Sequence, residues 1–398
     1  MDALMTTLPK DWEIKTFRDI STINQGLQIP ISQRLKAPTE HAKFYITIQA
    51  LNNRKEFEYI KTYNESVVCH KDDILMTRTG NTGMVITNIE GVFHNNFFKI
   101  NFDRTLINKD FLVYFLSLEQ TQRTILKKAG TSTIPDLNHN DFYSLTIPLP
   151  PLNEQIAIAN ILSALDRYLC ALDALILKKE GIKKALSFEL LSQRKRLRGF
   201  NQAWQRVKLG TYKYRRGSFP QPYGNPQWYS DNGMPFVQVY DVGENFKLTQ
   251  KTKQKISKIA QPMSVFVPKN SVIITLQGTI GRVALTQYDC YCDRTILIFD
   301  NNTLNDVNKY FFVLSLFTKF EEEKRKADGS IIKTITKQTL KDFEILLPPL
   351  NEQIAIANIL SALDNEIISL KNKKRQFENI KKALNHDLMS AKIRVLKK

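Results

Sequence analysis

The sequence contains no apolar run of about 18 residues, the length that a transmembrane helix requires. Its opening segment, MDALMTTLPK, has no apolar core of the kind that defines a signal peptide. These two absences argue against a transmembrane helix and a signal peptide. We therefore expect a cytoplasmic protein.

Cysteine and histidine are also scarce. The four cysteines are too few and too irregularly spaced for a disulfide framework or a four-ligand zinc site. The five histidines show no metal-ligand spacing and have no carboxylate or serine partner nearby in the sequence. The sequence therefore predicts reduced, structural thiols and no metal site. The residues concerned are Cys69, Cys170, Cys290, Cys292, His41, His70, His94, His139 and His386.

Motifs for nucleotide or methyl-donor chemistry are missing. No Gly-x-x-x-x-Gly-Lys-Ser/Thr loop is present, which argues against ATP hydrolysis by this chain. Pro150-Pro151-Leu152 superficially resembles the Asn/Asp-Pro-Pro-aromatic site of amino-methyltransferases, but it lacks the polar and the aromatic residue. The glycine-rich cofactor loop of those enzymes is absent too. We expect a non-catalytic chain without a cofactor of its own, and an autonomous enzyme remains the alternative.

Positive charge, by contrast, is abundant. The chain has 57 Lys and Arg residues against 39 Asp and Glu, a formal net charge of +18. Such self-repulsion is tolerated most readily where a polyanion neutralises it, which points to DNA or RNA. The alternative is that lysines such as those in Lys371–Arg375 only solvate long helices.

The most informative feature is an internal repeat. The 18-residue stretch LPPLNEQIAIANILSALD occurs at Leu149–Asp166 and again at Leu347–Asp364, without a substitution and at an offset of 198 residues. Identity over this length indicates two tandem units. Each unit has an upstream block of about 150 residues and a helical block of about 45.

The upstream blocks have diverged but keep an ordered set of matches. Trp12 answers to Trp204 and Gly26 to Gly217, and paired glycines follow an apolar strand in each block. Residue types are kept where packing or a turn needs them and differ between these points. We expect one scaffold with two specificities. Its fold class is α/β (α+β), with strand-rich, mixed or mainly antiparallel cores.

The helical blocks carry apolar residues at steps of three and four, a stripe that fits a two-helix coiled coil. Each helix is expected to run for about 40 residues, or roughly 60 Å. Asn153 and Asn351 are candidate caps for the first turns. A pseudo-twofold repeat makes the helices antiparallel. The expected segments are recognition domain 1 (1–148), a central spacer helix (149–198), recognition domain 2 (199–346) and a C-terminal spacer helix (347–398).

In this order, twice over, the motifs resemble the DNA-specificity subunit of a type I restriction-modification system. The resemblance covers the whole chain. It implies two target recognition domains that each read half of a bipartite DNA site, with helices that set the gap. It also implies docking of two modification (methyltransferase) subunits, which carry S-adenosylmethionine and methylate adenine, and of restriction subunits that use ATP and Mg. The residues that carry the resemblance are Trp12, Trp204, Pro151–Gln155, Pro349–Gln353, Thr77–Gly83 and Thr275–Gly281.

Candidate DNA contacts lie in two kinds of segment. Glycine turns after the apolar strands display side chains able to read base edges, unless the turns are only structural hairpins. A basic, aromatic segment is better suited to phosphate. The candidates are Arg78, Thr79, Asn81, Thr82, Gln277, Thr279 and Arg282 in the turns, and Lys213, Arg215, Arg216 and Ser218 in the basic segment.

The identity of the two helix starts predicts two identical docking surfaces for a protein partner. Packing of the helices on each other would tolerate compensating drift, whereas two copies of one partner would not. Recent duplication or recombination within the gene is the alternative. The predicted interface consists of Asn153, Glu154, Gln155, Asn351, Glu352 and Gln353.

Two further functions compete with the specificity subunit of a type I complex. A stand-alone coiled-coil architectural or regulatory protein would bind double-stranded DNA without recruiting a methyltransferase. A specificity subunit of a type IIB-like enzyme would share the DNA-reading part.

Overall fold

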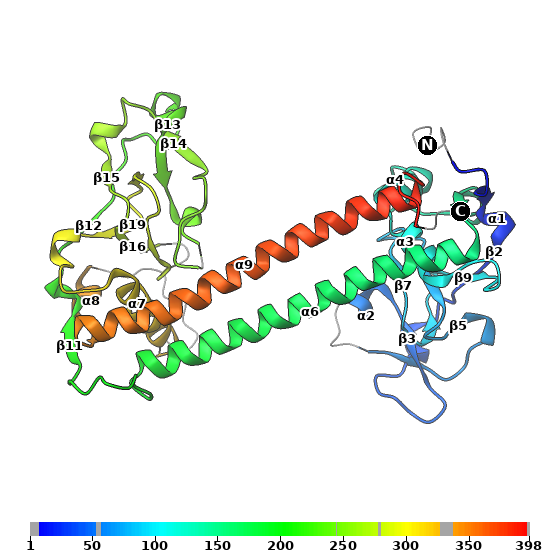
Figure 1. Ribbon diagram of the computed structural model, residues 1–398, viewed down its shortest axis with the longest axis horizontal. Helices are drawn as coiled ribbons and strands as arrows, with labels where there is room; N and C mark the ends of the chain where they lie inside the picture. Colours follow the sequence, from blue (N-terminus) through cyan, green and yellow to red (C-terminus); the bar gives the residue numbers. More distant parts are fainter. Residues whose placement is uncertain (1–7, 53–56, 244, 278–279, 327–336, 396–398) are drawn as a thin grey trace. The chain divides into compact units, whose positions relative to one another are not determined.

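The computed structural model describes residues 8–52, 57–243, 245–277, 280–326 and 337–395. The chain forms two compact units. Unit 1 comprises Met1–Ala174 together with Lys371–Lys398, and unit 2 comprises Leu175–Leu370. Each unit therefore joins one upstream block to a part of each long helix (Figure 1).

Unit 1 is built from short strands and helices in the upstream block. One four-stranded sheet has the order β2-β9-β6-β7 and is antiparallel throughout, and a second has the order β4-β3-β8-β5, with β3 and β8 parallel. The elements are β1 (Glu13–Thr16), α1 (Phe17–Ile20), β2 (Ser21–Gln25), β3 (Lys43–Ile46), α2 (Ile48–Asn52), β4 (Tyr59–Ile60), β5 (Val68–Cys69), β6 (Ile74–Thr77), β7 (Val85–Ile86), β8 (Gly91–Phe93), β9 (Phe97–Phe102), α3 (Lys109–Leu116), α4 (Glu119–Ala129), α5 (His139–Tyr143) and β10 (Thr146–Leu149).

Unit 2 repeats this plan. Its sheets have the orders β12-β19-β16-β17 and β14-β13-β18-β15, and β13 and β18 are parallel. The elements are β11 (Gln205–Lys208), β12 (Tyr214–Arg216), β13 (Tyr229–Val237), β14 (Gln254–Ile256), β15 (Val265–Val267), β16 (Val272–Thr275), β17 (Val283–Leu285), β18 (Cys290–Cys292), β19 (Ile296–Phe299), α7 (Lys309–Lys326), α8 (Lys337–Asp342) and β20 (Glu344–Leu347).

The two upstream blocks thus share one strand order and one parallel pair, although their sequences have diverged. In both blocks the first and last strands, β1 with β10 and β11 with β20, pair antiparallel and bring the block back to the start of a long helix. The predicted fold class, with a mainly antiparallel core in each of two repeated domains, is confirmed.

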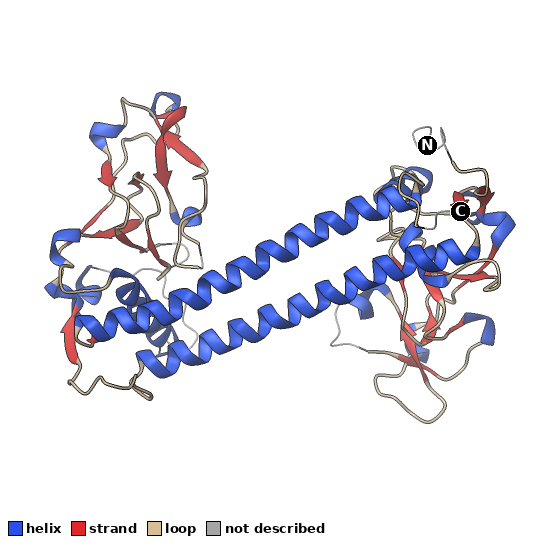
Figure 2. Cartoon of the chain, in the orientation of Figure 1, coloured by secondary structure: helices blue, strands red, loops and turns tan. Residues whose placement is uncertain are grey.

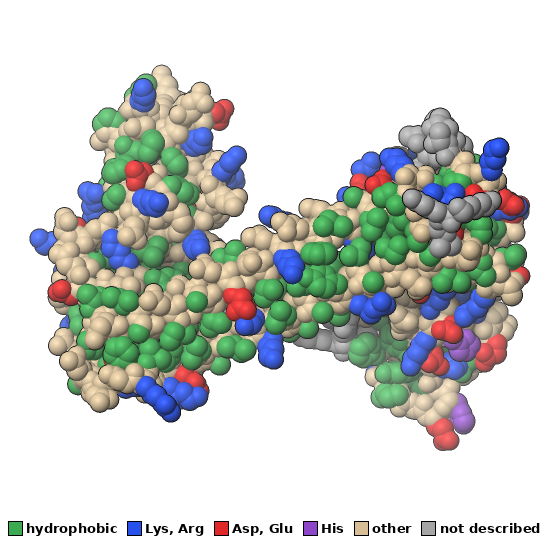
Figure 3. All heavy atoms as spheres, viewed as in Figure 1, with side chains coloured by type: hydrophobic (Ala, Val, Ile, Leu, Met, Phe, Trp, Pro, Cys, Tyr) green, Lys and Arg blue, Asp and Glu red, His purple; other side chains and the backbone are tan. Residues whose placement is uncertain are grey.

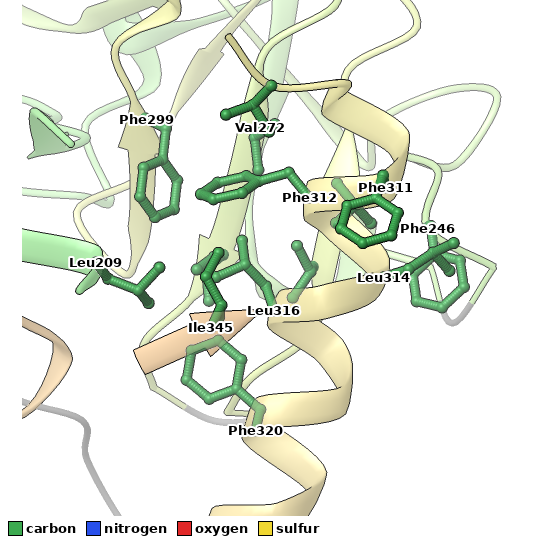
Figure 4. Packing of buried hydrophobic residues seen from close by; sticks show 14 of the residues in the cluster. Leu209, Phe246, Val272, Phe299, Phe311, Phe312, Leu314, Leu316, Phe320 and Ile345 are labelled. Carbon is green, nitrogen blue, oxygen red and sulfur yellow. The ribbon is translucent and has the colours of Figure 1, made fainter. Parts of the chain in front are cut away.

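Apolar side chains from the sheets and the flanking helices form the core of each block. In unit 2, Val272 from β16, Phe299 from β19 and Phe312 from α7 point toward one another (Figure 4), and all three are buried. The rings of Phe299 and Phe312 meet edge to face at 5.2 Å. Burial of this kind supplies about 1.5–3 kcal/mol for each large side chain.

The two long helices are α6 (Leu152–Leu191) and α9 (Leu350–Met389), each of 40 residues. Figure 2 shows both as uninterrupted helices. Within unit 1, Asp166 and Asp173 of α6 pair with Lys381 and Lys374 of α9, so rising numbers on one helix meet falling numbers on the other. The predicted length and antiparallel pairing are confirmed.

Unit 2 shows the same antiparallel relation between its own parts of the helices. Lys179 pairs with Glu366 and Lys183 with Asp364. Ile176 on α6 and Ile367 on α9 are buried as well.

The first turn of each long helix differs from the expected cap. Glu154 N–H donates both to the carbonyl oxygen of Pro151 (2.9 Å) and to Asn153 Oδ1 (3.0 Å). Asn153 lies inside the helix that begins at Leu152, so its side chain satisfies a first-turn N–H from within rather than as the N-cap. Asn351 makes the same contact to Glu352 N–H at 2.9 Å.

Candidate nucleic-acid interface and helix anchors

The glycine turn after β6 is largely fixed by intramolecular bonds. Arg78 Nη2 donates to Asp136 Oδ2 at 2.7 Å, and its guanidinium lies over the Phe98 ring at 5.5 Å. The Thr79 hydroxyl also donates to Asp136, and buried Thr82 donates to the Pro135 carbonyl oxygen at 2.7 Å. These three side chains brace the turn.

Asn81 is the exposed candidate of this turn. The glycines on either side explain why the turn is tight: Gly80 and Gly83 have φ values of +88° and +90°, where other residues are strained. A Cβ on Gly83 would also lie 2.7 Å from Gln122 Oε1 on α4. The hairpin interpretation therefore accounts for the glycines, and Asn81 is left for an external contact.

The matching turn of unit 2 lies between β16 and β17. Gln277 is exposed, whereas Arg282 is partly buried and its Nη1 donates to the Val242 carbonyl oxygen at 3.1 Å. Thr279 lies outside the described residues. Gly281 has φ +78° and packs against Phe320 of α7.

The basic segment on β12 presents cations to solvent. Lys213, Arg215 and Arg216 are exposed. Arg215 Nη2 donates to the Phe266 carbonyl oxygen at 3.2 Å, and the Ser218 hydroxyl donates to the Met263 carbonyl oxygen at 3.0 Å. Lys and Arg side chains are spread over the face of both units that Figure 3 shows, as the net charge of +18 requires.

The start of each long helix is anchored by a buried glutamate. Glu154 is 2% exposed, and it accepts hydrogen bonds from Trp12 Nε1 (3.1 Å) and from Arg394 Nε and Nη2 (2.7 and 2.8 Å). Arg394 also donates to Asp11 at 3.0 Å. The helix start, the beginning of the chain and the segment after α9 are thus joined in unit 1.

Unit 2 contains the same arrangement. Glu352 is fully buried and accepts from Trp204 Nε1 (3.1 Å) and from Arg196 Nε and Nη2 (3.2 and 2.6 Å). Arg196 follows α6, just as Arg394 follows α9, and the two arginines are separated by the repeat offset of 198 residues. Each repeat therefore supplies the arginine that closes the anchor of the other repeat.

The neighbouring glutamine joins the helix start to the upstream block. Gln155 is 1% exposed; its Oε1 accepts from Asn108 N–H at 2.9 Å, and its Nε2 donates to the Leu106 and Pro150 carbonyl oxygens. Gln353 accepts from Asn308 N–H at the same distance. Both amides are satisfied on both ends, as buried amides require.

These contacts correct part of the predicted partner interface. Glu154, Gln155, Glu352 and Gln353 are buried and engaged inside the chain, so their side chains are not a docking surface. They match because each holds its helix to its own upstream block through the same bonds. Packing restricts such residues as strictly as a partner would.

What stays exposed in both copies is a different stripe of the duplicated stretch. Its members are spaced three and four residues apart, so they lie on one face of each helix. Ile156 and Ile354 are 42% and 41% exposed. The anchoring bonds of the buried glutamates and glutamines do not account for the identity of this stripe. The residues exposed in both copies include Asn153, Ile156 and Asn160 on α6, and Asn351, Ile354 and Asn358 on α9; we call these six the duplicated stripe.

A tyrosine and a lysine meet the same aspartate in each unit. The Tyr114 hydroxyl donates to Asp166 Oδ2 at 2.7 Å, and Lys381 pairs with the other oxygen. In unit 2, Tyr310 and Lys183 contact Asp364 in the same way. The sequence did not single out these groups, although Lys183 and Lys381 are again separated by the repeat offset, a usable signal.

Tyr310→Phe is expected to lower the free energy of unfolding by about 1.5 kcal/mol near pH 8, since a hydrogen bond to a charged group is lost. Burial, and then the Asp364 carboxylate, raise the pKa of Tyr310 above its ordinary value. The folded tyrosine keeps its proton where the unfolded one loses it, so this contribution is full below pH 10 and declines as the pH rises further. Urea titrations at pH 8 and 10.5 measure the narrowing gap between the two proteins.

Tyr168→Phe is the matched control. Tyr168 packs on Phe377 across the seam, and its hydroxyl makes no hydrogen bond to any residue that the structure describes. An equal loss in both variants, unchanged with pH, would contradict the role given to the Tyr310 hydroxyl.

Neither metal-binding clusters nor membrane-spanning helices are found among the described residues. No group of three or more His, Cys, Asp or Glu side chains there is arranged to hold a metal ion. None of the described helices has the length and apolar character needed to cross a bilayer.

The sequence has known relatives over nearly its full length. The profile of the type I restriction modification DNA specificity domain matches residues 9–210 and 222–379. The putative type I restriction enzyme MjaX specificity subunit of Methanocaldococcus jannaschii is 26% identical over 418 residues, covering 98% of this chain and 95% of the relative. The MjaVIII specificity subunit of the same organism is 25% identical over 415 residues, with 98% and 94% covered.

A solved structure has the same fold. The type I restriction-modification S subunit from M. genitalium superposes with a TM-score of 0.61 at 17% sequence identity, covering 96% of this chain and 98% of that one. The duplicated recognition blocks, the paired long helices and the domain profile that matches both repeats agree. The chain belongs to the type I restriction-modification DNA specificity family and has the role of a DNA specificity subunit.

Proposed function

We propose that this chain reads a bipartite DNA site, with one half-site bound by the upstream block of each unit. The observation that carries the proposal is the repetition of one strand order in two blocks whose exposed loop residues differ. A common scaffold with different loops gives two specificities, and exposed cations such as Lys213 and Arg216 suit the phosphates beside the bases.

The chain itself is proposed to be non-catalytic. S-adenosylmethionine, ATP and Mg would be bound by partner subunits, namely two methyltransferase subunits and the restriction subunits. The missing nucleotide and methyl-donor motifs support this division of labour. The proposed function therefore combines DNA reading with recruitment of the subunits that perform the chemistry.

The direct experiment is to co-express the chain with the methyltransferase gene from its own locus in a methylation-free host, and to map modified adenines by single-molecule sequencing. A bipartite motif with a fixed, unspecified gap would support the proposal and reveal both half-sites. A stable complex without modification would favour a regulatory relative. Absence of any complex would favour a stand-alone architectural DNA-binding protein.

Docking of the two methyltransferase copies is proposed to use the duplicated stripe. Each stripe presents an exposed isoleucine between two asparagines, an apolar centre with hydrogen-bonding groups on either side. Two identical stripes suit two copies of one subunit. This replaces the buried Glu154 and Glu352 as the proposed contact.

Ile354→Asp is expected to remove one of the two methyltransferase copies while the melting temperature of the chain stays within about 2 °C, because the side chain is exposed. Native mass spectrometry of the co-purified complex measures the stoichiometry. Ile156→Asp should remove the other copy, and the double variant both.

Leu177→Asp is the matched control, since Leu177 is 72% exposed on α6 outside the duplicated stretch. It should keep both copies. Retention of two copies by the Ile156→Asp, Ile354→Asp double variant would rule out the stripe and return recombination as the reason for the identity.

A further inference from the structure

One tight turn has the same geometry in both units and a different residue at its tip. In unit 1 it joins β8 to β9 through His94–Asn96, and in unit 2 it joins β18 to β19 through Asp293–Thr295. Phe97 N–H donates to the His94 carbonyl oxygen at 3.0 Å, and Ile296 N–H to the Asp293 carbonyl oxygen at 2.9 Å. The two turns therefore close with the same hydrogen bond.

The glycine that follows the neighbouring strand, β2 or β12, packs directly against each turn. A Cβ on Gly26 would lie 2.2 Å from the His94 carbonyl oxygen, and a Cβ on Gly217 would lie 2.3 Å from the Asp293 carbonyl oxygen. No other residue fits at these distances. The matched glycines of the two blocks thus allow the backbone to approach this turn closely.

The first residue of each turn fixes it from inside with its side chain. His94 Nδ1 accepts from Asn96 N–H at 3.1 Å, and Asp293 Oδ1 accepts from Thr295 N–H at 2.7 Å. Asp293 is 3% exposed. Burial also lowers the pKa of His94, which favours the neutral imidazole, and the bond from Asn96 N–H selects the tautomer whose Nδ1 accepts. A histidine in one block and an aspartate in the other therefore accept the equivalent turn hydrogen bond.

The tip of the unit 2 turn is Arg294. Its side chain is exposed, and its guanidinium lies over the Tyr223 ring at 5.2 Å. The Tyr223 hydroxyl donates to the buried Asp293 carboxylate, so the ring is itself held in place. Within the described part of the chain, Arg294 makes no ion pair with an acidic residue. It is a pre-oriented cation with no acidic side chain of the described residues within ion-pair distance.

The tip of the unit 1 turn is Asn95. Its Nδ2 donates to Gln28 Oε1 at 3.3 Å, and its backbone carbonyl oxygen accepts from Gln25 Nε2 at 3.4 Å. Its Oδ1 is buried and has no hydrogen-bond partner among the described residues. A buried amide oxygen without a partner costs free energy, so binding of a base is favoured if the Asn95 side chain turns outward and exchanges its bond to Gln28 for bonds to the base.

We propose that this turn tip reads a base in each half-site, with Arg294 specifying guanine and Asn95 specifying adenine. The inference deepens the proposed function and rests on it. Arginine binds guanine O6 and N7 with two donors, and asparagine binds adenine N6 and N7 with one acceptor and one donor. After the Asn95 side chain turns outward, its oxygen would accept the adenine N6 proton.

Phosphate binding explains the pair of residues less well. A position kept for phosphate would hold a cation in both blocks, whereas this position holds a cation in one and a neutral amide in the other. Invariant backbone geometry with a changed side chain is what reading of two different bases requires. The neighbouring Arg216 on β12 fits phosphate better, because it is exposed and no turn fixes it.

The test maps modified adenines for the chain co-expressed with its methyltransferase. Arg294→Ala should relax one base position in one half-site, with discrimination at that position falling about 10- to 100-fold and the other half-site unchanged. Arg294→Gln should move the preference at that position toward adenine. Asn95→Ala should relax one position in the opposite half-site.

The unchanged half-site is an internal control for folding and for assembly in every variant. Arg216→Ala is the comparison for a phosphate contact, and it should lower modification at all sites alike. An unchanged motif in both Arg294→Ala and Asn95→Ala, or an even loss at all sites like that of Arg216→Ala, would overturn the base-reading role. A wild-type complex with no bipartite motif would overturn the proposed function itself.

Discussion

Replacing Glu352 with alanine is expected to lower the free energy of unfolding of unit 2 by about 2–3 kcal/mol. The carboxylate is fully buried, and it accepts from the Trp204 indole and from two nitrogens of Arg196. Its removal leaves the Trp204 indole N–H and the guanidinium of Arg196, whose side chain is 29% exposed, without this acceptor. Urea unfolding of the full chain, followed by tryptophan fluorescence, measures the change.

The adjacent Asn351→Ala is the matched control. Asn351 is exposed and one residue away on the same helix, so its replacement should change the free energy of unfolding by no more than about 0.5–1 kcal/mol. Equal stability of the two variants would contradict the anchoring role of Glu352. Glu154→Ala should destabilise unit 1 in the same manner, so loss of a bound partner in that variant would not by itself identify a docking surface.

Inserting four residues into both long helices is expected to widen the gap between the half-sites by about 2 base pairs, since four residues add roughly 6 Å of helix. The insertions belong after Ala174 in α6 and after Leu370 in α9, where unit 1 and unit 2 divide. At these points every ion pair within each unit keeps its partner, including Asp166 with Lys381 and Lys183 with Asp364. Mapping of modified adenines measures the gap.

The single insertions provide the control. An insertion in α6 alone or in α9 alone gives the two helices unequal lengths, so it should lower stability and modification rather than move the gap. Loss of folding in the double-insertion variant, or an unchanged gap in its modified sites, would contradict the spacer role of the helices. Both half-sites should keep their base preferences throughout.

The long helices were predictable in length and direction because their apolar stripe is local and repeats over 40 residues. The fold class was also within reach, since the matched glycines and apolar strands indicated one scaffold used twice. The role of Glu154 and Gln155 was not, because a sequence shows that residues are identical without showing whether they face solvent. Arg196 and Arg394 were overlooked for a related reason: their partners lie more than 150 residues away.

The candidate DNA contacts divide in the same way. The sequence identified the glycine turns, but the partners of Arg78 and Thr82 come from the segment around Asp136, more than 50 residues further along the chain. Those bonds assign both side chains to bracing the turn. No sequence motif surrounds Arg294, and its equivalence to Asn95 is visible only when the two turns are compared in space.

By itself, the sequence determined that this protein is a basic, duplicated chain of two recognition blocks and two long antiparallel helices, because charge, periodicity and identity are properties of the residues in order. The tertiary structure alone decided which of the duplicated residues anchor a helix and which remain exposed. The physical reason is that burial and hydrogen bonding depend on partners far away in the chain: Glu352 is held by Arg196 and Trp204, whereas Ile354, two residues on, faces solvent.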